Sequence, residues 1–172
     1  MSRLITDLFV AELAEEAATT RRVLERVPEG RNDWRPHPRS MQLGYLAWLV
    51  ATMPNWVRMT LAQDSLDLAP VGGKGSQASA AGSTAELLAK FDESLAHATS
   101  SLGSCDDAHL QTTWKLLVAG RVVQESTRLY VLRHSTFNHW VHHRGQLTVY
   151  LRLNDAPVPS IYGPTADEPQ FK

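Results

Sequence analysis

The stretch NHWVHHRGQLTVYLR, residues 138–152, places three histidines within five positions. It belongs to a longer segment, residues 127–153, in which apolar residues recur with the period of an α-helix for about seven turns. Asn154 and Pro157, just beyond this segment, are typical of the end of a helix. The stretch therefore predicts a long helix that carries the histidines and needs other helices to cover its apolar face.

His139 and His143 are the two histidines that can act together. Side chains four positions apart on a helix lie above one another, with Cβ atoms about 5 to 6 Å apart, so two imidazoles at this spacing can bind one divalent ion. Such a pair can equally be a hydrogen-bonded pair in the core or part of a polar surface. The same helix face predicts that the pair points inward, because it carries Leu132, Ser135, Thr136, His139, His143, Gln146, Tyr150 and Leu153.

Three more segments have helical periodicity, and a proline interrupts one of them. These segments cover residues 2–28, 41–63 and 83–103. Pro54 removes a backbone donor from the second segment, so we expect a kink near Met53. With the histidine helix, the three segments predict an all-α fold, a four-helix bundle that forms a single domain over residues 1–172.

The two longer connections constrain how these helices are arranged. Residues 65–82 form a crossover that, extended at about 3.3 Å per residue, spans more than the roughly 30 Å of a 20-residue helix. The second and third helices can therefore run parallel, which gives up-down-down-up connectivity. Residues 106–126 contain β-branched residues around Ala119 and Gly120, which predicts a short irregular segment or a hairpin before the last helix.

A third ligand for the histidine pair is hard to identify in the sequence. Zinc and nickel centres usually have three protein ligands, but residues 41–63 contain no His, Asp, Glu or Cys. Glu12 and Glu16 lie four positions apart in the first helix and are most simply explained as solvated residues beside its apolar face. His142 is rotated about 100° from His143 around the helix and lies nearer the edge of the shared face.

Gly145 follows the histidines within the same predicted helix. Glycine in a helix interior costs about 1 kcal/mol relative to alanine, and close packing of another backbone against this turn would explain its presence. Either a helix of the same chain or a second subunit would supply that contact. A purely structural dimer would then respond to substitutions at Gly145 or Trp140 and not to changes in the histidines.

Composition narrows the classes of function. The formal net charge is -1 at pH 7, so the chain lacks the basic field by which proteins bind nucleic acids. Cys105 is the only cysteine, which excludes an intrachain disulfide and an all-thiolate metal site. No run of residues approaches the ~18 to 20 apolar residues that span a bilayer, and acidic residues interrupt the N-terminal segment where a signal peptide would be apolar. These features predict a cytoplasmic protein without nucleic-acid or membrane partners.

The run NHWVHHRGQLTVYLR, with the NDAPVPSIYGP that follows it, resembles the last helix and tail of the DinB/YfiT-like family of bacterial four-helix-bundle proteins. The stretch DWRPHPRSMQLGYLAWLVATMPNW, residues 33–56, is similar to the loop and second helix of that family. The resemblance implies a bundle, commonly a homodimer, whose divalent metal is held by one histidine of helix two and the HxxxH pair of helix four. His139 and His143 match the pair, whereas Leu49 stands at the position that matches the helix-two histidine.

Two hypotheses about function follow from this resemblance. Some relatives are similar to thiol-dependent transferases, so the first is a homodimer that binds zinc, nickel or manganese and transfers a small thiol, because coordination to a cation stabilises a thiolate. Cys105 is not placed to supply that sulfur, so a small thiol cofactor would have to do so. The second is a metal-free dimeric bundle, a binding or stress-response module, that holds a small ligand beside hydrogen-bonded histidines.

Overall fold

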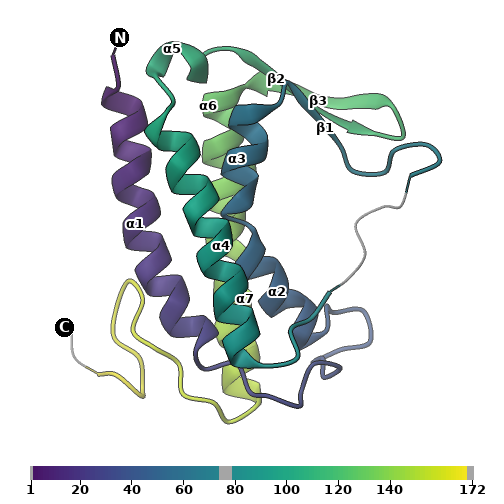
Figure 1. Cartoon of the computed structure of the whole chain (residues 1–172). Coiled ribbons are helices and arrows are strands. Elements are labelled where there is room, and N and C mark those ends of the chain that lie inside the picture. The colour runs from purple at the N-terminus through teal and green to yellow at the C-terminus, as the bar shows by residue number, and fades with distance from the viewer. Residues whose placement is uncertain (1, 74–78, 170–172) are drawn as a thin grey trace.

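The computed structural model describes residues 2–73 and 79–169, and most of its elements are helices (Figure 1). Residues 74–78 of the predicted crossover lie outside the described part. The separate helices are α1 (Leu4–Leu24), α2 (Leu43–Thr52), α3 (Asn55–Ala62), α4 (Thr84–Gly103) and the short α5 (Asp107–Leu110). The last helical segment is continuous and consists of α6 (Arg128–Tyr130), the π-helix η1 (Val131–Asn138) and α7 (His139–Leu153).

The helical segments run in two directions. In Figure 1, α1 and the α6–η1–α7 segment run one way, whereas α2, α3 and α4 run the other way. The helices α3 and α4 therefore run parallel, as the length of the crossover between them permits. Among the described residues, no helix is both long enough and apolar enough to cross a membrane.

Pro54 separates α2 from α3, so the kink predicted near Met53 is confirmed as a break between two helices. Proline has no N–H to donate to the carbonyl four residues earlier, which is that of Val50. The indole Nε1 of Trp140 on α7 donates to this carbonyl instead, over 2.9 Å. Trp140 is 1% exposed, so it is a core residue that satisfies a carbonyl left free by the break.

The prediction of an all-α fold is wrong, because a small three-stranded sheet lies beside the helices. The strand β2 (Thr113–Val118) pairs antiparallel with β3 (Arg121–Thr127), and β1 (Ser65–Asp67) pairs parallel with β2. Ala119 and Gly120 at the β2–β3 turn have φ of 51° and 75°, the left-handed values that tight hairpin turns need. The predicted hairpin is therefore present.

The strand β1 extends this hairpin into a sheet. Its Asp67 carboxylate accepts hydrogen bonds from the backbone N–H groups of Ala119 and Gly120, over 3.1 and 2.7 Å. Arg128, which is 3% exposed, donates to the carbonyls of Gln63 and Thr113 and so joins the end of α3 to β2. These contacts place the sheet against α3 and η1, at the end of the fold opposite the C-terminal tail (Figure 1).

The core is shared by the long helices. Its buried side chains come from each of them and include Phe9, Leu13, Leu46, Val50, Phe91, Ala98, Trp140 and Leu147. On α7 the most buried positions are Trp140, Arg144, Leu147 and Leu151, at 1% exposure or less. The predicted inward face is confirmed in part: Leu132, Thr136, His143 and Tyr150 are buried, whereas Gln146 and Leu153 are exposed. The wider turn of the preceding π-helix shifts the inward face by one residue and leaves the histidine pair at its edge.

Candidate functional site

The structure brings the predicted histidine pair together at the start of α7. The Nε2 atoms of His139 and His143 lie 2.8 Å apart, and the ring centroids are 4.5 Å apart. His143 is 6% exposed, and His139 is half-buried. The two rings therefore meet through the same nitrogen, at the rim of the bundle interior.

The other nitrogen of His143 decides what the two Nε2 atoms can do. Nδ1 of His143 lies 2.8 Å from Oε1 of Gln146, and an amide oxygen only accepts, so Nδ1 carries the proton. A neutral His143 with its proton on Nδ1 can only accept at Nε2, so Nε2–H of His139 donates to it over 2.8 Å. The two rings are therefore hydrogen-bonded to each other.

A divalent ion bound by both Nε2 atoms would replace the hydrogen bond between them. A further proton is disfavoured there: burial lowers the pKa of His139 and of His143, and the charges of neighbouring histidines lower both further. A backbone hydrogen bond with Ser135 raises the pKa of His139 and so opposes part of the effect of burial on that ring. Both rings are therefore predominantly neutral near pH 7. Histidines whose second nitrogen donates to an amide or backbone oxygen are the usual ligands of divalent metals.

Within residues 2–73 and 79–169, no third ligand joins the pair. Among the described residues, no three His, Cys, Asp or Glu side chains cluster as a metal site requires. Leu49, half-buried on α2, packs against the core with its hydrocarbon side chain. The wall next to His139 is Trp56 of α3, edge-on with its ring centroid 5.5 Å away. The donor set consists of two imidazoles, which fit two positions of an ion and leave the others to water or a ligand.

The remaining histidines of this helix lie outside the pair. His142 is exposed and its ring centroid is 5.2 Å from that of His143. His134 is also exposed and stacks on Tyr130 at 4.3 Å, away from His139 as its spacing predicts. Substitutions of His142 and His134 are therefore suitable controls for a test of the pair.

Glu12 and Glu16 are both ion-paired, and the expectation of a solvated side chain is wrong for Glu16. Its side chain is 13% exposed and its Oε2 lies 2.5 Å from Nη1 of Arg144, which is 1% exposed. Arg144 also donates to Thr20 Oγ1 and to the hydroxyl of Tyr162 in the tail, which in turn donates to Glu16. The buried guanidinium needs a counter-charge, which draws Glu16 inward. Glu12 pairs through both oxygens with Arg133 at the surface.

Gly145 does not make the close helix contact that the sequence predicts. It is exposed, and a Cβ atom built on it would meet nothing within 4 Å outside its own turn. No helix of the described chain therefore explains this glycine. Contact with a second subunit stays a prediction.

A cavity of about 50 Å³ lies between α3, the sheet and η1, and neither His139 nor His143 is among its lining residues. It shares Trp56 and Ser135 with the surroundings of His139. Its remaining lining residues are Met59, Thr60, Leu66, Leu68, Trp114, Leu116, Gln124, Val131 and Thr136. The sequence did not indicate this cavity, because one of its walls depends on β1, a strand of three residues.

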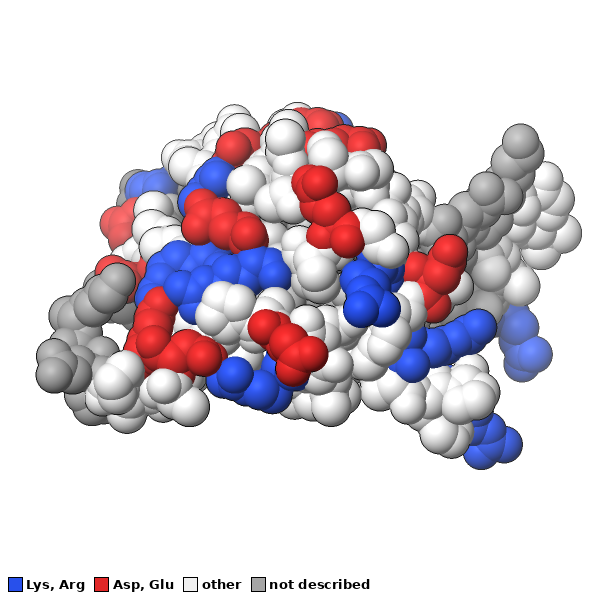
Figure 2. All heavy atoms as spheres, turned by 90° about the horizontal axis from the view of Figure 1, so that it is seen from below, with Lys and Arg blue, Asp and Glu red and all other residues white. Residues whose placement is uncertain are grey.

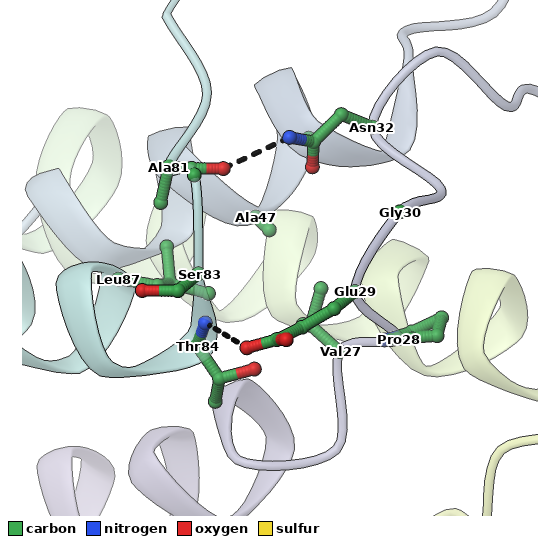
Figure 3. Close-up of a pocket in the computed structure, with 12 residues that line it drawn as sticks. Val27, Pro28, Glu29, Gly30, Asn32, Ala47, Ala81, Ser83, Thr84 and Leu87 are labelled. Atoms are coloured by element: carbon green, nitrogen blue, oxygen red, sulfur yellow. Dashed lines mark hydrogen bonds between the residues drawn. The ribbon is translucent and has the colours of Figure 1, made fainter.

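Figure 3 shows a second cavity, of about 20 Å³, at the beginning of α4. Across it, Asn32 Nδ2 donates to the carbonyl of Ala81, and the backbone N–H of Thr84 donates to Glu29 Oε1, each over 2.8 Å. These bonds tie the loop before α2 to the first turn of α4. The role of this cavity is structural, since the polar groups shown here hydrogen bond to each other.

The end of the fold that carries the tail is held by ion pairs. Figure 2 shows this end, where basic and acidic side chains lie beside one another. Glu168 pairs with Arg22 and Arg26, and Asp167 pairs with Arg152. The tail is therefore fixed to α1 and α7 by charge.

Comparisons with known proteins agree with this architecture. A model of the DinB family matches residues 1–170. A DinB-like protein from Bacillus cereus is 19% identical, with a TM-score of 0.69 over 90% of this chain and 95% of that chain. A DinB-like protein from Bacillus subtilis is 15% identical, with a TM-score of 0.65 over 94% and 98% of the two chains. At these identities the solved structures show the fold alone. No curated protein matches the sequence.

Proposed function

The chain belongs to the DinB family, and from this premise we propose that His139 and His143 together bind one divalent ion, zinc, nickel or manganese. The observation that carries the proposal is the 2.8 Å approach of the two Nε2 atoms, with Nδ1 of His143 held by the side-chain oxygen of Gln146. Imidazole nitrogen suits zinc and nickel better than manganese, so we expect the first two to bind more tightly.

The site we propose is open and weak. Two protein ligands leave at least two positions of a tetrahedral ion to water or to a substrate, as in catalytic sites and unlike closed structural ones. Leu49 offers hydrocarbon at the position that, by the resemblance, matches a helix-two histidine. We therefore expect weaker binding than a three-histidine site would give.

Transfer of a small thiol to an electrophile is the reaction that we propose to test first. A bound divalent ion would stabilise the thiolate of a small thiol cofactor near pH 7. In this chain, Trp56 forms an apolar wall beside the two imidazoles. This residue would exclude water from one side of the site.

The test is the metal content of tag-free protein equilibrated with limiting zinc or nickel. We expect the wild type to retain metal and the double variant His139→Ala/His143→Ala to lose it. His142→Ala is the matched control, since it removes an exposed imidazole of the same helix and should retain the metal. Equal, near-zero occupancy in wild type and double variant would rule the proposal out.

A second candidate is a metal-free protein that binds a small ligand beside the histidines. The apolar cavity, which has Trp56 in its wall, and the lack of a third ligand among the described residues favour it. It predicts that zinc, nickel and manganese leave the melting temperature unchanged, because a ligand that binds only the folded state must raise it. A clear rise with one of these metals would reject it.

A further inference from the structure

We propose that Gln146 is a positioning residue of the histidine site. Through its hydrogen bond to His143 it sets the tautomers of both imidazoles, and so decides which nitrogen each ring can offer to a divalent ion. The inference rests on the proposed function, because it concerns how this chain prepares the two imidazoles for an ion. It goes further by giving the two rings different roles: His143 is ready to act as a ligand, whereas His139 must first shift a proton.

Gln146 is well placed to act on His143. It lies three positions further along α7, a spacing at which side chains are neighbours on a helix. Its Oε1 lies 2.8 Å from Nδ1 of His143. Gln146 is exposed, whereas His143 is 6% exposed, so the amide reaches the ring from the solvent side. A substitution at Gln146 can therefore remove this hydrogen bond without changing the core.

The amide oxygen selects one tautomer of His143. A neutral imidazole carries its proton on one of its two nitrogens, and the hydrogen bond that one nitrogen makes decides which. An amide oxygen accepts and cannot donate, so Oε1 of Gln146 holds the proton of His143 on Nδ1. Nε2 of His143 then has no proton. This is the state in which an imidazole coordinates a metal through Nε2.

The tautomer of His143 in turn selects that of His139. The two Nε2 atoms are 2.8 Å apart, and a hydrogen bond between them needs one proton, which His139 must supply. Nε2 of His139 becomes a ligand only when this proton has left to water and Nδ1 has taken one up from water, so that the ring stays neutral. The two imidazoles are therefore unequal ligands, although their spacing on the helix makes them look equivalent.

Within the described residues, Gln146 is the only oxygen acceptor bonded to His143. The nitrogens of this ring have Gln146 and His139 as their hydrogen-bond partners. His142 and Trp56 lie nearby with their rings, 5.2 Å from His143 and 5.5 Å from His139 between centroids, and contribute packing. The choice of tautomer therefore depends on one exposed side chain, which makes it testable by substitution.

The first test reads the tautomers in metal-free protein, so it does not depend on metal binding. Nitrogen chemical shifts of the imidazoles, measured by NMR with EDTA present and assigned with His139→Ala and His143→Ala, distinguish protonated from unprotonated nitrogens. We expect Nδ1–H at His143 and Nε2–H at His139 in wild type. Gln146→Leu should give mixed tautomers in both rings, whereas Gln146→Glu keeps an oxygen acceptor and should retain the wild-type pattern.

The matched control is Gln63→Leu, which makes the same change at an exposed position at the end of α3. It should leave the tautomers of both rings as they are in wild type. A general effect of replacing an exposed amide by an apolar side chain would appear in both leucine variants. An effect confined to Gln146→Leu therefore belongs to the hydrogen bond with His143.

The second test measures zinc affinity by competition with a chelator. Loss of a group that orients a ligating imidazole weakens metal binding by about ten-fold or more, so we expect this loss in Gln146→Leu and not in Gln146→Glu or Gln63→Leu. In a His143→Ala background the change Gln146→Leu should have no effect, because Gln146 acts through His143. A merely structural role of Gln146 would give the same loss in both backgrounds.

Three results would each overturn the proposal: Nε2–H at His143 in wild type, unchanged tautomers in Gln146→Leu, or equal and measurable zinc affinity in wild type and Gln146→Leu. Failure of the proposed function looks different. If wild type binds no zinc while Gln146→Leu changes both tautomers, the metal site is rejected and the control of the tautomers by Gln146 is supported.

Discussion

Arg144 and His143 are adjacent in the sequence but belong to two regions that treat buried polar groups differently. The tail-end cluster, formed by Arg144, Glu16, Thr20 and Tyr162, supplies several oxygen partners to one guanidinium. The histidine and cavity region holds a hydrogen-bonded histidine pair and, among the described residues, two buried neutral polar atoms without a hydrogen-bond partner, Nε1 of Trp114 and the hydroxyl of Thr136. In the tail-end cluster, Glu16 Oε2 also has no hydrogen-bond partner, but it is ion-paired with Arg144. The regions therefore differ in that opposite charges hold the tail-end cluster together, whereas the unpartnered atoms of the cavity region are neutral, so the two should respond differently to substitution.

The largest effect that tests this difference is expected at the tail-end cluster. Arg144→Met leaves the Glu16 carboxylate, 13% exposed, without its counter-charge and should lower the free energy of unfolding by about 3 to 5 kcal/mol. Arg133→Met is the matched control, since the Arg133–Glu12 pair is 39% and 31% exposed and should contribute about 1 kcal/mol or less. Urea denaturation measures both. Similar losses in the two variants would contradict the distinction between the regions.

Replacing a threonine by valine should affect the free energy of unfolding differently in the two regions. Thr20→Val removes an acceptor of Arg144 and should lower the free energy of unfolding by about 1 to 2 kcal/mol. Thr136→Val removes a hydroxyl that has no partner in the described structure and should raise it by about 1 kcal/mol or leave it unchanged. Denaturant midpoints of the two variants decide, and a clear loss for Thr136→Val would mean that its hydroxyl is satisfied.

Gly145 tests whether a second subunit completes the histidine side. In an isolated chain, Gly145→Ala should raise the free energy of unfolding by about 1 kcal/mol, because alanine is the better helix former and the added methyl group has open space. If a homodimer packs on this turn, as we propose from the resemblance, the same change should weaken association. Sedimentation of wild type and variant over a range of concentrations distinguishes the two results.

A pH effect, small because the group lies near the surface, is expected from Glu168 in the tail. Hydrogen bonds from Arg26, Ser160 and Arg22 lower the pKa of Glu168 to about 2, from its ordinary value of 4.5. A pKa depressed in the folded state means that the contribution is full above about pH 4.5 and is lost as the pH falls toward 2. The free energy of unfolding should therefore fall more steeply with acid in wild type than in Glu168→Gln, and parallel pH profiles would show that the ion pairs are not formed.

Local pattern was sufficient to predict much of the fold. The helix periods, the break at Pro54 and the hairpin around Ala119 and Gly120 each depend on residues close together in the chain. The strand β1 was missed because three residues carry no period and pair with a strand about 50 positions away. The π-helix was missed because its apolar pattern differs from that of an α-helix by about one residue per turn.

The candidate site was predicted only in part, because some of its features depend on residues close together in the chain and others do not. The spacing of His139 and His143 on one helix is local, and the structure brings the two rings together. The inward turn of Glu16 depends on Arg144, which lies in another helix, so the charge of Glu16 alone was misleading. The apolar cavity combines α3, the sheet and η1, and only the assembled fold reveals it.

The indole of Trp140 has a consequence for the order in which the chain folds. Pro54 leaves the carbonyl of Val50 without a backbone donor, and the only side chain seen to satisfy it in the described structure arrives 90 positions later. A nascent chain ending before the last helix would keep this carbonyl in water. The N-terminal half is therefore expected to close its interior only after translation of residue 140, which makes core formation a late event in synthesis.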